Sequence, residues 1–136
     1  MIQSHTKLQD PPAILVVEDE PLLLMIVSET LREAGFVVCE AGDAEAALGI
    51  IKNEPKIELV ISDVKMPGMN GYQLVDAGLA LRPDLKIMLM TGYAHEPVPK
   101  WIHQAGIQVL YKPFDFDKLP GFASGILQGH SSSFRL

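Results

Sequence analysis

Leu59-Val60-Ile61-Ser62-Asp63 is a short, almost wholly apolar run that ends in an acid. Three further apolar runs are also followed at once by charged or hydroxyl residues. They are residues 14–17 before Glu18 and Asp19, residues 87–90 before Thr91, and residues 109–111 before Lys112. In a parallel α/β sheet, the residues just past the carboxyl ends of the strands converge on one crevice. The pattern therefore predicts that Glu18, Asp19, Asp63, Thr91 and Lys112 share one site.

The remaining sequence predicts a helix after each strand. Expected strands cover residues 14–17, 36–40, 57–62, 86–90 and 107–111, and expected helices cover 21–34, 44–53, 71–81, part of 94–105, and 116–127. Short apolar strands are typical of a parallel sheet with helices on both faces. We therefore expect a flavodoxin-like (βα)5 fold, a doubly wound five-stranded parallel sheet with strand order 2-1-3-4-5. Pro97 and Pro99 forbid normal hydrogen bonding early in the fourth helix, so that helix should start late or be mobile.

Length, charge and composition restrict the class of protein. The chain has 136 residues, 48% of them hydrophobic, and a net charge of -6. We expect one domain at residues 13–128, between a flexible arm at 1–12 and a flexible tail at 129–136. The acidic balance and the lack of any Lys/Arg run argue against direct nucleic-acid binding. The single Cys39 cannot form an internal disulfide, and no secretory leader or apolar run long enough to span a membrane is present, so we expect a cytoplasmic protein.

The longest aliphatic run, residues 22–27, lies in the first expected helix. Only one stripe of a covering helix can face a sheet, so some of these side chains must meet solvent. If Leu23, Ile26 and Val27 point inward, Leu22 and Met25 point outward. Those two residues are either scattered surface hydrophobic residues or a docking patch for a partner protein.

Four motifs, taken together in their order and spacing, carry a family resemblance. They are Ile14-Leu15-Val16-Val17-Glu18-Asp19-Glu20, Asp63-Val64-Lys65-Met66-Pro67-Gly68-Met69-Asn70-Gly71, Met90-Thr91-Gly92-Tyr93 and Lys112-Pro113-Phe114. With these motifs the chain resembles the receiver domain of two-component response regulators over about residues 13–127. The resemblance implies that Asp63 accepts a phosphoryl group from a phosphohistidine on a sensor histidine kinase or a phosphotransfer protein.

The resemblance also implies a magnesium site. Clustered carboxylates repel one another and favour a hard divalent cation with oxygen ligands. In the family, Asp19, Asp63 and the backbone carbonyl of Lys65 would hold Mg²⁺, and Glu18 would act through a water molecule or by orienting Asp19. Each acid alone has an ordinary alternative, since Glu18 and Asp19 are also able to cap the first helix.

Two further residues have implied roles at the phosphoryl group. Lys112 would pair with a phosphoryl oxygen, next to a cis Lys112–Pro113 peptide bond. Thr91 would donate its hydroxyl to another phosphoryl oxygen and draw its loop inward. Tyr93 would modulate access of water to the acyl phosphate. Many receivers carry an aromatic residue three positions before the conserved lysine, whereas this chain has Val109, so a ring-flip switch is not expected here.

Several alternatives stay open at this point. The chain is either a stand-alone receiver or the receiver segment of a hybrid histidine kinase, and either a monomer or a phosphorylation-dependent dimer that signals by contact with an unknown downstream protein. We expect a signalling phosphoacceptor that assists its own phosphorylation and dephosphorylation, not an enzyme. A phosphatase of the haloacid dehalogenase type would need a second acid two residues after its nucleophile, where this chain has Lys65. A pseudo-receiver, which binds partners without taking phosphate, is the more serious rival.

Overall fold

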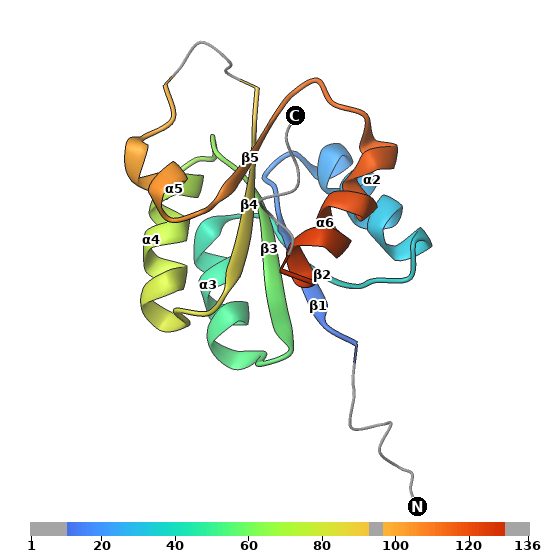
Figure 1. Cartoon of the computed structure of the whole chain (residues 1–136), viewed down its shortest axis with the longest axis horizontal. Coiled ribbons are helices and arrows are strands. Elements are labelled where there is room, and N and C mark those ends of the chain that lie inside the picture. The colour runs from blue at the N-terminus through green and yellow to red at the C-terminus, as the bar shows by residue number, and fades with distance from the viewer. Residues whose placement is uncertain (1–10, 93–96, 130–136) are drawn as a thin grey trace, which may run out of the picture.

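A five-stranded parallel sheet forms the centre of the computed structural model, which describes residues 11–92 and 97–129. The strands are β1 (Ala13–Val17), β2 (Val37–Ala41), β3 (Ile57–Asp63), β4 (Lys86–Thr91) and β5 (Gln108–Tyr111). Their order in the sheet is β2-β1-β3-β4-β5 (Figure 1), and every neighbouring pair is parallel. The predicted fold class and strand order are confirmed.

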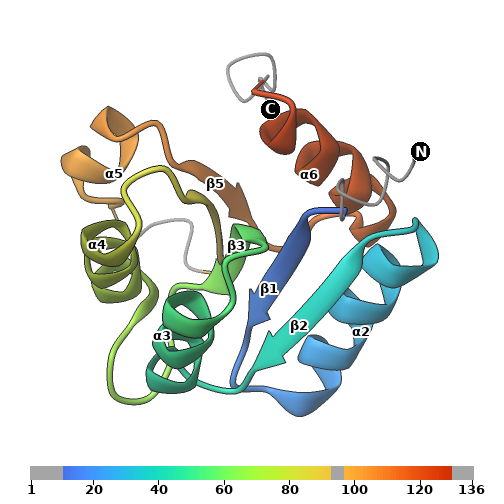
Figure 2. The same cartoon turned by 90° about the horizontal axis from the view of Figure 1, so that it is seen from below.

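Helices cover both faces of this sheet (Figure 2). One layer consists of α2 (Pro21–Glu33), the short 3-10 turn η1 (Phe116–Lys118) and α6 (Leu119–Leu127), and the other consists of α3 (Ala44–Asn53), α4 (Gly71–Leu81) and α5 (Lys100–Gln104). Successive side chains of a strand point to opposite faces. Accordingly, Ile14 and Val16 pack in the core beneath α2 and α6, while Leu15 and Val17 pack in the core beneath α3, α4 and α5. The strand β1 is therefore buried on both sides.

Side-chain caps set where the first three helices begin. The Glu20 carboxylate accepts hydrogen bonds from the backbone N–H groups of Leu22 and Leu23 at the start of α2. Asp43 caps α3 as predicted from its position, and Asn70 forms a capping box with Gln73 at the start of α4. Such caps satisfy backbone donors that have no partner within the helix. Because Glu20 caps α2, the carboxylates of Glu18 and Asp19 are not needed for that purpose.

The helix α5 is short and starts late. It covers only Lys100–Gln104, directly after Pro99, which is its N-cap residue. Pro97 and Pro99 lack the backbone N–H groups that an earlier start would use, so this feature agrees with the prediction from sequence.

The apolar run of α2 is more exposed than the sequence suggested. Leu22 and Met25 are exposed as expected, but Ile26 is also 37% exposed, and Val27 carries the inward contact together with Leu31. The expectation that Ile26 points inward was wrong because the inward stripe of this helix runs through Leu23 and Leu24, which pack against the core, to Val27. Residues 1–10 and 130–136, which hold most of the expected arm and tail, lie outside the described residues.

Membrane spanning finds no support in the part of the chain that the structure describes. No helix there is both long enough and apolar enough to cross a bilayer.

Candidate functional site

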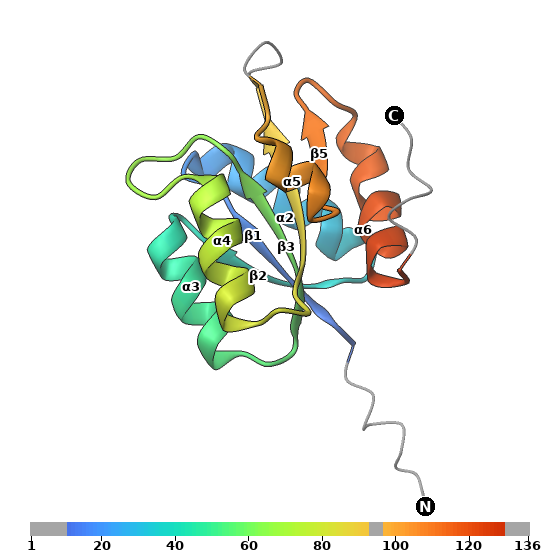
Figure 3. The same ribbon diagram turned by 60° about the vertical axis from the view of Figure 1, so that its left-hand side comes forward.

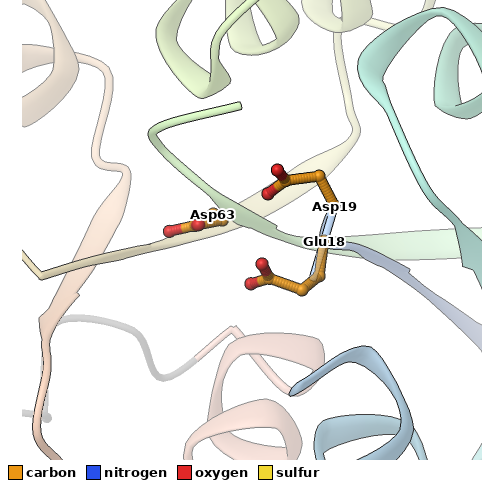
Figure 4. Close-up of side chains that lie close together, drawn as sticks. All are labelled: Glu18, Asp19 and Asp63. Carbon is orange, nitrogen blue, oxygen red and sulfur yellow. The ribbon is translucent and has the colours of Figure 1, made fainter. Parts of the chain in front are cut away.

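Three carboxylates meet at the carboxyl-terminal edge of the sheet. Glu18 and Asp19 follow β1 directly, and Asp63 is the last residue of the neighbouring strand β3. One carboxylate oxygen from each residue lies within 4.8 Å of the others. Figure 4 shows the three side chains extending to the same side of the two strands. The order of the strands thus brings together Asp19 and Asp63, which are 44 positions apart in the sequence.

Lys112 brings one positive charge to these acids. It follows the edge strand β5, and its Nζ lies 3.1 Å from Asp63 Oδ1 and 3.9 Å from Glu18 Oε1. The Lys112–Pro113 peptide bond is cis, as the family resemblance implies. The backbone N–H of Lys112 donates to the carbonyl of Thr91 at 2.7 Å, which fixes the start of the loop after β5 against β4. One ammonium group faces three carboxylates, so negative charge remains in excess.

Glu18 is the most unusual of the acids because its carboxylate is buried. The residue is 1% exposed, and Glu20 N–H donates to its Oε2 at 3.2 Å. The other oxygen, Oε1, has no hydrogen-bond partner among the described residues. Burial, followed by the charge of Asp63, raises the pKa of Glu18 to about 7. A buried carboxylate oxygen without a donor is costly, and a bound cation would remove that cost.

Asp63 is held from two sides through one carboxylate oxygen. Val64 N–H donates to Oδ1 at 3.0 Å, and Lys112 Nζ contacts the same atom. The Ser62 hydroxyl donates to the Asp63 carbonyl at 2.8 Å. These contacts fix the direction of a side chain that is 11% exposed. Both of the side-chain contacts are to Oδ1, so the second oxygen, Oδ2, takes part in neither of them.

Gly71, the first residue of α4, lies directly against the backbone of Asp63. A Cβ atom at this position would stand 2.5 Å from the Asp63 carbonyl oxygen and 2.8 Å from Val64 Cα. The Gly71 N–H donates to the carbonyl of Val64 at 2.8 Å. The helix therefore starts in contact with the backbone that carries Asp63. Sequence reasoning missed this role, although a glycine directly after the Asn70 cap was the available signal.

The structure describes three of the other four residues singled out from the sequence. Thr91, the last residue of β4, is buried at the same edge of the sheet. Lys65 is exposed in the loop after Asp63, and Val109 is partly buried against the core beneath α5. Tyr93 lies outside the described residues. The roles assigned to these four residues stay predictions.

The donor set at this edge fits a hard divalent cation. Carboxylate oxygens are the ligands that Mg²⁺ and Ca²⁺ take in proteins. The three acids offer one oxygen each at mutual distances short enough to share an ion, and Glu18 Oε1 is buried without a hydrogen-bond donor. An ion there would balance the excess negative charge that Lys112 leaves. The arrangement suits binding of an oxyanion by the cation and Lys112 together.

Comparison with known proteins agrees with this geometry. Residues 14–122 match the model of the response regulator receiver domain. The chain is 39% identical over 103 residues to the response regulator protein FleR of Pseudomonas aeruginosa, covering 75% of this chain and 22% of that protein. It is 35% identical over 109 residues to the C4-dicarboxylate transport transcriptional regulatory protein DctD of Rhizobium meliloti, covering 79% of this chain and 24% of that protein. The chain thus spans less than a quarter of the length of these two relatives.

The fold comparison gives the same family. A crystal structure of a CheY-like response regulator receiver domain protein from Methanospirillum hungatei JF-1 superposes with a TM-score of 0.81 and 28% identity, covering 92% of this chain and all of the other. The family match covers far more than half of the chain, and the strand order is the one expected. This chain belongs to the receiver domains of two-component response regulators.

Proposed function

We propose that this protein is a phosphoacceptor, in which Asp63 takes a phosphoryl group from a phosphohistidine of a sensor histidine kinase or a histidine phosphotransfer protein. The observation that carries the proposal is the cluster of Glu18, Asp19 and Asp63 with the Lys112 ammonium 3.1 Å from Asp63 Oδ1. The family match supports it. In this proposal the protein is a signalling component that assists its own phosphorylation and dephosphorylation, and its location is the cytoplasm.

The chemistry follows from the position of the Asp63 oxygens. Oδ1 is occupied by Val64 N–H and Lys112, so Oδ2 attacks the phosphorus. The new O–P bond forms as the N–P bond of the phosphohistidine breaks, and the departing imidazole takes up a proton. Charge gathers on three equatorial oxygens in such a transfer, and the protein helps mainly by positioning and by countercharge. Lys112 supplies countercharge, and the Thr91 hydroxyl donates to another phosphoryl oxygen.

The acids would hold Mg²⁺ in this proposal. Asp19 and Asp63 would coordinate it directly, the backbone carbonyl of Lys65 would be a third ligand, and Glu18 would act through a water molecule. When bound, the ion would supply positive charge to the phosphoryl oxygens. The support is the mutual distance of the carboxylate oxygens and the buried Glu18 Oε1, which accepts no hydrogen bond from the described residues.

Exposed apolar residues next to the site suit docking of the phosphodonor. Leu22 is 59% exposed and Met25 is 53% exposed, and both lie in the first turns of α2, directly after the loop of Glu18 and Asp19. Replacing both by serine should slow transfer from any kinase that phosphorylates the wild type, because apolar contact area is lost. Labelling by acetyl phosphate, which needs no docking surface, should be unchanged. Equal slowing with both donors would argue against docking here.

The decisive experiment is the intact mass of the wild-type protein after incubation with acetyl phosphate, with and without Mg²⁺. We expect one adduct of about 80 Da that requires Mg²⁺ and is absent from Asp63→Asn. Asp84→Asn, at the opposite edge of the sheet, is the matched control and should be labelled like the wild type. Folding of each variant is checked by circular dichroism. Absence of the adduct in a folded wild-type sample would favour the pseudo-receiver.

A further inference from the structure

A broad surface hollow separates the start of α4 from α5. Its volume is about 750 Å³, and its walls include Met69, Tyr72, Gln73, Asp76 and Trp101. Figures 1 and 3 show α4 and α5 side by side on the same face of the sheet. The helix α5 begins at Lys100, and Trp101 in its first turn lines the hollow together with residues from the first turns of α4.

The residues of α4 that line this hollow form one face of the helix. Tyr72 and Asp76 are four residues apart, so their side chains are neighbours on the helix surface. Leu74, Val75 and Gly78, which lie between and beyond them in the sequence, are buried toward the sheet. The hollow thus has a regular wall that belongs to a well-packed helix.

The lining combines aromatic rings with a single charge. Tyr72 and Trp101 contribute ring surface, and Trp101 is 39% exposed. Asp76 is the one charged residue of the lining, it is exposed, and no salt bridge to it is recorded within residues 11–92 and 97–129. A carboxylate beside exposed aromatic faces is complementary to a cation with a flat, weakly hydrated surface, which describes a guanidinium group.

We propose that this hollow binds a segment of a partner protein that presents an arginine flanked by apolar side chains. The guanidinium group would stack on Trp101 and pair with Asp76, and the flanking side chains would contact Met69 and Tyr72. The volume exceeds that of one side chain and falls in the range of established ligand pockets. Met69 is partly buried and unbranched, so it adapts to different apolar neighbours.

The test uses the tripeptide acetyl-Leu-Arg-Leu-amide and its citrulline counterpart, which keeps the shape of arginine but lacks its charge. Trp101 is the only tryptophan of the chain, so both the intrinsic indole fluorescence and the single indole N–H signal in a nitrogen-15 spectrum report on this hollow. We expect a saturable change with the arginine peptide and about tenfold weaker binding of the citrulline peptide.

Matched variants locate the charge that the peptide recognises. Asp76→Asn should weaken the arginine peptide about two- to fivefold and reduce its preference over citrulline, because the charged pair is lost while the stacking of the guanidinium group on Trp101 remains. Asp84→Asn, an exposed acid at the amino-terminal edge of the sheet, should leave both affinities unchanged.

Three results would overturn the proposal. They are equal binding of the two peptides, the absence of any saturable change, and an indole signal that shifts with protein concentration alone. The last result would mean that a second copy of this chain occupies the hollow.

Discussion

Both edges of the sheet, at the carboxyl and the amino ends of its strands, carry acidic and basic residues. The two sets differ in how far their side chains are exposed to solvent. At the carboxyl-terminal edge, Glu18 and Asp63 are buried, and Lys112 faces them at 3.9 Å and 3.1 Å. At the amino-terminal edge, Glu58 and Asp84 are exposed beside a hollow of about 270 Å³. Exposed charges are solvated and cost little, whereas buried like charges need a counterion.

At the amino-terminal edge, the guanidinium group of Arg82 is satisfied by hydrogen bonds to the protein backbone. Arg82 donates to the backbone carbonyls of Glu54 and Pro55, each at 3.3 Å, and so ties the end of α4 to the loop before β3. At the other edge, Glu18 Oε1 has no donor within the described part of the chain. The comparison teaches that burial of charged groups, more than their number, distinguishes the carboxyl-terminal edge of this sheet.

The largest effect is expected where the carboxyl-terminal edge meets α4. Gly71→Ala would place a Cβ 2.5 Å from the Asp63 carbonyl oxygen, so backbone must shift. We expect the free energy of unfolding, measured by urea denaturation, to fall by about 3 kcal/mol. Gly78→Ala in the same helix is the control, because its Cβ would meet only Leu85 and Ile51 side chains at 3.6 and 3.7 Å. A Gly71→Ala protein as stable as the wild type would show that α4 does not rest on Asp63.

The second effect comes from removing the cation of the carboxyl-terminal edge. Lys112→Met leaves the three carboxylates without their counterion, so the free energy of unfolding at pH 8 without divalent cations should fall by about 2 to 3 kcal/mol. Added Mg²⁺ should restore part of the loss. Lys86→Met at the opposite end of the sheet is the control, and it should change stability by about 0.5 kcal/mol or less. Equal losses in the two variants would erase the contrast between the edges.

The strands that carry this site were predicted well because the sequence signals for strand ends are local. Apolar runs followed by polar residues located the strand ends, and the paired prolines located the late start of α5. Parallel topology then decided which strand ends meet, and the predicted order of strands placed Asp19 next to Asp63. These inferences need only periodicity and general rules of parallel sheets.

Contacts between segments that are distant along the chain could not be predicted from the sequence. The exposure of Ile26 depends on which stripe of α2 packs against the sheet, and the contact of Gly71 with Asp63 depends on the path of the loop between them. The burial that raises the pKa of Glu18 depends on packing of the whole edge. Each of these properties depends on how side chains are arranged in three dimensions, and residue types alone do not specify that arrangement.

The third effect is a pH dependence that belongs to Glu18. Its pKa in the folded protein is about 7, above the ordinary value of 4.5, so the folded state retains a proton that the unfolded state releases between these values. Unfolding free energy contributed by Glu18 is therefore fully present below pH 4.5 and is lost as pH rises through 7. Urea denaturation in the presence of a chelator should show this decline, and Glu18→Gln should remove it. A decline of equal size in Glu18→Gln would assign it to another group.

The smallest effect on stability, and the sharpest test of the comparison, comes from two exposed acids at opposite edges. Asp19→Asn and Asp84→Asn should each change the free energy of unfolding by about 0.5 kcal/mol or less without metal, because exposed charges are solvated. With Mg²⁺ at about ten times its dissociation constant, the wild type and Asp84→Asn should gain about 1.4 kcal/mol. Asp19→Asn should lose this gain, since Asp19 supplies one of the three neighbouring carboxylate oxygens. If both variants kept the gain, burial of Glu18 and Asp63 alone would account for metal binding, and the exposed acid of the cluster would be no different from an exposed acid elsewhere.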